Sequence, residues 1–116
     1  MNVEHLNLLK QDDSNSQLAV FKLHGKLILE TVGSFLRTMR PECAPELVLD
    51  MSGVKFLDSA GIGALAQLFV HRKGQGQRFA LAALTQQAKA VMEVAGLLKL
   101  LPAYASVTDA IRAESY

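Results

Sequence analysis

The chain has 116 residues, of which half are hydrophobic and 20% are charged, with 12 Lys and Arg against 11 Asp and Glu. This length suits one domain with a core of ordinary size, and the apolar content excludes an intrinsically disordered chain. The charge balance lacks the basic excess typical of proteins that bind the phosphate backbone of nucleic acids. We therefore expect a single domain over residues 1–116 and no nucleic-acid partner.

The cysteine count and the N-terminal residues indicate the cellular compartment of the protein. A single cysteine, Cys43, excludes an internal disulfide framework and fits a reducing environment. Residues 1–5 lack the basic and then apolar run of a signal peptide, and no segment approaches the length of a transmembrane helix. The sequence predicts a cytoplasmic protein without direct membrane insertion.

Two apolar segments open the chain. Residues 3–10 and 17–24 each hold enough Leu, Val and Phe for a strand, and residues 11–16 between them are of the types that form turns. We expect these strands to pair as an antiparallel hairpin, with the second strand ending at residues 24–26, His-Gly-Lys.

Two predicted helices flank a central strand. Apolar residues at helical spacing predict the first helix over residues 32–39, and Pro41 stops it. Residues 46–51 form a short strand whose continuous apolar centre is typical of a parallel strand covered on both faces. The second helix begins near Ser59 and is broken at residues 74–76, Gly-Gln-Gly.

The last third of the chain continues the alternation. Residues 79–84 predict a buried strand, and Thr85 can cap a helix that Gly96 ends in the left-handed conformation. A weak strand follows over residues 100–104, and residues 106–109 resemble a capping box that begins a short last helix. Strands that alternate with helices predict an α/β fold with a mixed, mostly parallel sheet of about five strands and about four helices.

The candidate site lies in residues 57–64, where a buried apolar run ends and the second predicted helix begins. Asp58 or Ser59 can cap this helix, and Gly61 and Gly63 allow another backbone to approach closely. A phosphate on Ser59 would meet the free amides and the positive dipole end of the helix. We therefore interpret Ser59 as a site of modification and not of catalysis.

The same helix suggests a docking surface. Helical spacing predicts a core-facing side that consists of Ile62, Leu65, Ala66, Phe69 and Val70. The opposite side has no formal charge before Arg72 and consists of Ala60, Ala64, Gln67, Leu68 and His71. Charged residues are depleted from interface cores, which favours a partner surface, although Ala and Gln are also simply good helix formers. The predicted partner-binding residues are Asp58, Ser59, Ala60, Gly61, Ala64, Gln67 and Leu68.

Catalytic and ligand-binding motifs are weak in this sequence. Residues 61–66 match the dinucleotide fingerprint in form, but no acidic residue lies between Asp58 and Glu93 to bind a ribose. Ser59 lacks the G-x-S-x-G frame of a hydrolase nucleophile. The possible metal ligands His5, His24, His71 and Cys43 have no metal-ligand spacing. We expect no catalytic residue, metal or cofactor, and hence no enzyme.

Residues 49–63, with the sequence LDMSGVKFLDSAGIG, resemble the strand and Asp-Ser phosphorylation motif of the STAS family. This family comprises the sulfate-transporter and anti-sigma-factor-antagonist domains, and the resemblance runs by pattern from about Val3 to Ala113. It implies the STAS fold and a stand-alone bacterial anti-sigma-factor antagonist that regulates transcription by partner switching.

The resemblance also implies partners. The unphosphorylated protein would bind an anti-sigma factor that is also a serine kinase and so release the sigma factor, whereas phosphorylation of Ser59 would end that binding. A PP2C-type phosphatase would restore the protein. The chain departs from many antagonists after Gly25, because its first acidic residue there is Glu30. The alternative within the family is a STAS subunit of a transporter or signalling scaffold without regulated phosphorylation.

Overall fold

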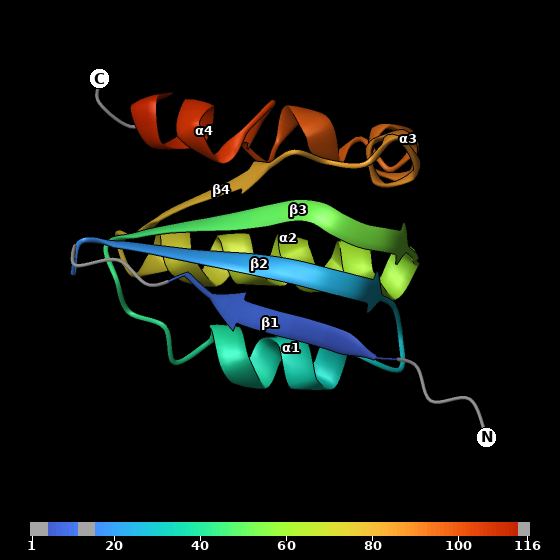
Figure 1. Cartoon of the computed structure of the whole chain (residues 1–116), viewed down its shortest axis with the longest axis horizontal. Coiled ribbons are helices and arrows are strands. Elements are labelled where there is room, and N and C mark those ends of the chain that lie inside the picture. The colour runs from blue at the N-terminus through green and yellow to red at the C-terminus, as the bar shows by residue number, and fades with distance from the viewer. Residues whose placement is uncertain (1–4, 12–15, 114–116) are drawn as a thin grey trace.

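A computed structural model describes residues 5–11 and 16–113 of the chain. In these residues the chain forms five strands, four α-helices and one short 3₁₀-helix (Figure 1). In chain order the elements are β1 (Leu6–Lys10), β2 (Leu18–Leu27), α1 (Val32–Met39), β3 (Glu46–Leu57), α2 (Ser59–Gly74), β4 (Arg78–Ala82), α3 (Gln86–Val94), η1 (Leu97–Lys99), β5 (Ala103–Tyr104) and α4 (Val107–Ala113).

The strands form one sheet in the order β1-β2-β3-β4-β5. The first pair, β1 and β2, is antiparallel, and each of the following pairs is parallel. This arrangement confirms the predicted α/β fold, with its opening hairpin at one edge of a mostly parallel sheet. Most of the predicted turn between β1 and β2, residues 12–15, lies outside the described residues.

Helices cover both faces of the sheet, and the alternation of side chains along the strands divides the core into two parts. Leu47 and Leu49 of β3 belong to a large cluster with residues of α1 and α2, whereas Val48 between them belongs to a smaller cluster with Ala110 of α4. Figure 1 shows α2 behind β2 and β3, and α1 beside β1. The central strand is therefore buried on both sides, as its apolar run predicted.

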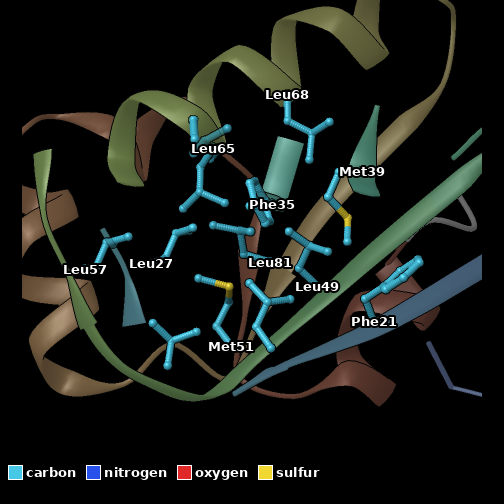
Figure 2. Close-up of a cluster of buried hydrophobic side chains, with 14 of the residues drawn as sticks. Phe21, Leu27, Phe35, Met39, Leu49, Met51, Leu57, Leu65, Leu68 and Leu81 are labelled. Atoms are coloured by element: carbon cyan, nitrogen blue, oxygen red, sulfur yellow. The ribbon is translucent and has the colours of Figure 1, made fainter. Parts of the chain in front are cut away.

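The orientation of α2 about its own axis differs from the prediction. Figure 2 shows Leu65 and Leu68 pointing from α2 into the large cluster, where Phe35 also lies. Leu68 is 1% exposed and Ala64 is 5% exposed, so placing these two residues on an accessible docking surface was wrong. Val70, predicted to be in the core, is 64% exposed. Apolar residues occur all round this helix, so their spacing contains little information about which side is buried.

Arg72 is another residue of α2 whose burial was not predicted. Its side chain is fully buried and donates from Nε to the carbonyl oxygen of Arg78 at 2.9 Å, and from its two terminal nitrogens to those of Glu42 and Ala44 at 3.0 and 2.6 Å. Burial lowers the pKa of the guanidinium, and the nearby charge of Glu42 opposes that effect. The side chain thus joins the end of α2 to the segment before β3 and to Arg78, the first residue of β4.

Glu42 itself lies in a small polar cluster. One carboxylate oxygen lies 3.0 Å from Lys10 Nζ, and the other accepts the Ala44 N–H at 3.1 Å. Partial burial alone would raise the pKa of Glu42, but these hydrogen bonds, together with the charges of Lys10 and Arg72, outweigh burial and lower it. This cluster attaches the loop after α1 to the end of β1.

Strand lengths also differ from the prediction. The second strand does not end at Gly25, and β3 does not end at Met51, because the two strands continue side by side to the pair Leu27 and Leu57. Two register shifts accompany this extension, one of them beside Gly25, whose φ of 125° favours glycine. The extension places the carboxyl ends of both strands directly before the candidate site.

The helix-end signals in the second half of the chain are confirmed. The Thr85 side chain accepts the Ala88 N–H at 3.2 Å, and Gly96 follows α3 in the left-handed conformation with φ 76°. The Ser106 hydroxyl accepts the Asp109 N–H at 3.0 Å at the start of α4. The weak strand is shorter than predicted, since β5 holds only two residues.

We predict that Arg72→Met lowers the free energy of unfolding by about 3 kcal/mol or more, because it removes the buried guanidinium that donates to three partly buried carbonyl groups. Arg37→Met is the matched control, since Arg37 is exposed on α1 and its loss should cost no more than about 0.5 kcal/mol. Urea unfolding followed by circular dichroism measures both values. Equal midpoints for the two variants would contradict an anchoring role for Arg72.

Candidate functional site

Asp58 fixes the start of α2. It has an extended backbone conformation at the N-cap position, and its Oδ1 accepts the Gly61 N–H at 2.9 Å. Its Oδ2 accepts the Leu29 N–H at 3.1 Å, from the loop between β2 and α1. Of the two capping candidates in the sequence, Asp58 is therefore the cap, and one carboxylate joins the helix to the neighbouring loop.

That neighbouring loop is itself tightly bonded. Thr31 is 4% exposed; its hydroxyl oxygen accepts the Ile28 N–H at 3.0 Å and lies 2.8 Å from the Lys26 carbonyl oxygen. The loop is thereby folded into a defined turn, and Leu29 at its tip is 68% exposed. The loop thus presents an apolar side chain beside the start of α2.

Gly61 allows this close packing. A Cβ at position 61 would clash with the Leu27 carbonyl oxygen and would also lie 2.8 Å from Leu57 Cδ1. Gly61 is buried for this reason, so this predicted partner-binding residue does not lie on the accessible surface, while its predicted role in close backbone approach is confirmed. Gly63 differs, because a Cβ there would have no neighbour within 4 Å.

Gln87 holds the other side of the junction. Its Oε1 accepts the Leu57 N–H at 3.0 Å, and its Nε2 donates to the Leu57 carbonyl oxygen at 3.1 Å. The pairing of β3 with β4 ends at Asp50 and Ala82, seven residues before β3 reaches Leu57. The side-chain amide of Gln87 thus bonds the strand as a neighbouring peptide group would. Nothing in the sequence marked this residue, because a helical Gln normally indicates a solvated position.

Ser59 is exposed on the first turn of α2, and within the described chain its hydroxyl has no hydrogen-bond partner. Gly63, Ala66 and Val70 follow it at spacings of four, three and four residues, which places them in line along the solvent side of the helix. Among the predicted contact residues, Ala60 is half-buried and Gln67 is exposed. The structure therefore has an uncharged surface beside Ser59 that consists of Ala60, Gly63, Ala66, Gln67 and Val70, which we call the α2 surface.

The geometry gives the enzyme interpretations no support. His71 lies on α2 twelve residues after Ser59, about 18 Å along the helix axis, which is too far for a general base. Gly61 and Gly63 lie inside the helix and form no phosphate-binding turn before it. Among the described residues, His, Cys, Asp and Glu form no group of three or more that could hold a metal ion.

No helix in the described part of the chain is both long and apolar enough to span a membrane.

One family model matches most of the chain. The chain belongs to the STAS domain family, whose model matches residues 9–110. It is also similar to the crystal structure of an anti-sigma factor antagonist from Mycobacterium paratuberculosis, with a TM-score of 0.83, 25% identity and coverage of 94% of this chain and 93% of that chain.

Two further solved structures share the fold. The anti-sigma factor antagonist SpoIIAA in its unphosphorylated form has a TM-score of 0.74 and 17% identity, covering 97% of this chain and 98% of that one. The murine anion transporter Slc26a9 contains a similar portion, with a TM-score of 0.75 and 19% identity, covering 94% of this chain but 22% of the transporter. The fold thus occurs both alone and as part of a membrane transporter.

Gly61 and Gly63 provide a matched pair of substitutions on one helix. We predict that Gly61→Ala lowers the free energy of unfolding by about 2 kcal/mol or more, because the added methyl group meets the Leu27 carbonyl oxygen. Gly63→Ala should raise it by up to about 1 kcal/mol, because Ala favours the helix and the site is open. Thermal and urea unfolding of both variants measure the difference. Destabilisation by Gly63→Ala would show that this position is not open in solution.

Proposed function

We propose that this protein is an anti-sigma-factor antagonist that binds an anti-sigma factor and releases it when Ser59 is phosphorylated. The observation that carries the proposal is the exposed, unpartnered Ser59 hydroxyl at the Asp58-capped start of α2, within the described chain, next to the α2 surface. The similarity to the antagonist from Mycobacterium paratuberculosis supports the choice of partner.

The proposed partners have separate roles. The anti-sigma factor would itself be the serine kinase that modifies Ser59, and a PP2C-type phosphatase would remove the phosphate. A kinase needs an accessible hydroxyl, and Ser59 is exposed. The similar structure of SpoIIAA is that of its unphosphorylated form, so phosphorylation distinguishes two forms of that protein. We extend the same cycle to Ser59 here.

The switch would act through electrostatics. A phosphate adds about −1.5 to −2 charges at neutral pH, and helix N-terminal amides tolerate that charge in the free protein. In a complex, the same charge would be desolvated against a surface that fits a hydroxyl, and a buried charge without a partner is costly. The α2 surface contributes no Lys or Arg that could compensate for it. Binding should therefore be lost with little change in the fold.

A second candidate function is a STAS subunit of a transporter or signalling scaffold in which the serine is not phosphorylated. The similarity to the STAS-like portion of Slc26a9 favours it. The genes beside this one discriminate between the two functions. A histidine-kinase-like ATPase and a PP2C phosphatase would support the antagonist, whereas transporter subunits would support the second function.

We predict that phosphorylation of Ser59 weakens binding to the anti-sigma kinase by at least about 3 kcal/mol, roughly a hundredfold in Kd. Ser59→Asp should reproduce part of this loss, and Ser59→Ala should keep the affinity but abolish phosphate incorporation. Calorimetry of the unmodified protein, the phosphoprotein and both variants measures the affinities, and mass spectrometry maps the phosphate. Equal affinities of all forms, or phosphate on Ser52 or Thr85, would contradict the phosphorylation switch and favour the second candidate function.

We also predict that the purified protein has no turnover of its own, because no nucleophile, base and orienting group come together around Ser59. Ester hydrolysis and nicotinamide reduction should stay at the rate of the buffer. The informative control is Ser59→Ala, which should behave in the same way. A measurable rate that this substitution removes would show that the protein is an enzyme.

A further inference from the structure

A shallow groove of about 600 Å³ lies beside α2 and begins one helical turn after Ser59. Its lining residues are Arg40, which follows α1, and Gly63, Ala66, Gln67, Val70 and His71 of α2. Three of the α2 surface residues, Gly63, Ala66 and Val70, provide its apolar part over about 10 Å of helix. The groove therefore continues the proposed contact site along the helix.

The residues that line the groove include no acid, and the nearest carboxylates beside the two helices, Asp58 and Glu42, are already bonded to backbone N–H groups or to Lys10. Neither α1 nor α2 contains an Asp or a Glu, whereas Arg37, Arg40 and Lys73 are exposed on or beside these helices. Within the described chain, the side chains of Arg40 and His71 have no hydrogen-bond or ion-pair partner. The distance across a groove of this size is comparable with the Debye length of about 8 to 10 Å at physiological salt, so an occupant would experience these charges. A segment with acidic side chains fits this surface.

The walls of the groove determine the form of that segment. Five of the lining residues belong to α2, and Arg40 is the cap residue at the end of α1, so no lining residue belongs to a strand and no strand edge is available for an added β-strand. Apolar positions spaced by three and four residues, as Gly63, Ala66 and Val70 are, match the spacing of anchor side chains on an amphipathic helix. The geometry favours a helix that packs against α2.

We propose that the groove between α1 and α2 binds an acidic amphipathic helix of the same protein partner that contacts Ser59. The inference rests on the proposed function for the identity of that partner, but the chemistry of the segment follows from the groove alone. Apolar side chains of the partner helix lie over Ala66 and Val70, and its carboxylates face Arg40 and His71. This second contact increases the affinity of the complex and makes that affinity depend on salt concentration, which the contact at the uncharged Ser59 hydroxyl does not.

Two synthetic 15-residue peptides test the chemistry without a natural partner. Both carry Leu at the same helical positions, and the remaining positions alternate between Ala and Glu in one peptide and between Ala and Lys in the other. Titration into ¹⁵N-labelled protein should shift the amide signals of Gly63, Ala66, Gln67 and Val70 with the Glu peptide, with at least tenfold tighter binding than the Lys peptide. Raising the salt concentration should weaken this binding. Equal binding of the two peptides, shifts confined to another surface, or no binding by either peptide would overturn the inference.

Variants then locate the contact. Val70→Glu and Arg40→Glu should each weaken binding of the Glu peptide at least tenfold, and both positions are exposed, so the fold should persist. Lys99→Glu in η1 is the control, because it reverses one exposed charge outside the groove and should leave the Kd unchanged. If Lys99→Glu weakened binding as much as Arg40→Glu, the effect would come from net charge and the groove would not be the site.

The same variants separate this inference from the proposed function. With the anti-sigma kinase used to test Ser59, Val70→Glu should weaken binding at least tenfold in addition to any effect of Ser59→Asp. Loss of binding with Ser59→Asp but not with Val70→Glu would overturn the groove and leave the phosphorylation switch intact. Loss with Val70→Glu but not with Ser59→Asp would support the groove and overturn the switch.

Discussion

The carboxylate of Asp58 is the constraint on which the geometry around Ser59 depends. One of its oxygens bonds the first turn of α2, and the other bonds the backbone of Leu29 in the preceding loop. The absence of a side chain at Gly61 lets α2 lie in direct contact with the backbone of Leu27, the last residue of β2 before that loop. Ser59 therefore projects from a fixed platform made of the loop between β2 and α1 and the start of α2, and its hydroxyl is exposed to solvent.

Local signals in the sequence predicted most of the fold because each has a short-range physical cause. Pro41 lacks an amide proton and lies just beyond α1, and Thr85 and Gly96 have the backbone roles that their side chains suggest. The continuous apolar run of β3 indicated a strand covered on both faces, which the two core clusters confirm. The position of Ser59 at a strand-to-helix junction followed from the same signals.

The parts that the sequence could not predict depend on contacts between distant residues. Arg72 is buried because it binds carbonyl groups of Glu42 and Ala44, which are 30 and 28 positions away in the chain. When those contacts are unknown, an arginine indicates the solvent side of a helix. The side of α2 predicted to face the core was therefore displaced by about a quarter turn around the helix axis. The length of β3 likewise depends on its pairing with β2, and no local signal records where that pairing stops.

The bond between Gln87 and Leu57 has a consequence for how the site can change over evolution. At Leu57 the backbone is bonded by one side chain and not by a neighbouring strand. The rigidity of the junction therefore depends on one residue, Gln87, that lies far from Ser59 in the sequence. A substitution in α3 could loosen the platform without altering any residue that a partner touches. Closely related chains with identical contact surfaces could therefore differ in how rigidly they hold the serine. Selection could change this rigidity without changing the residues that recognise the partner.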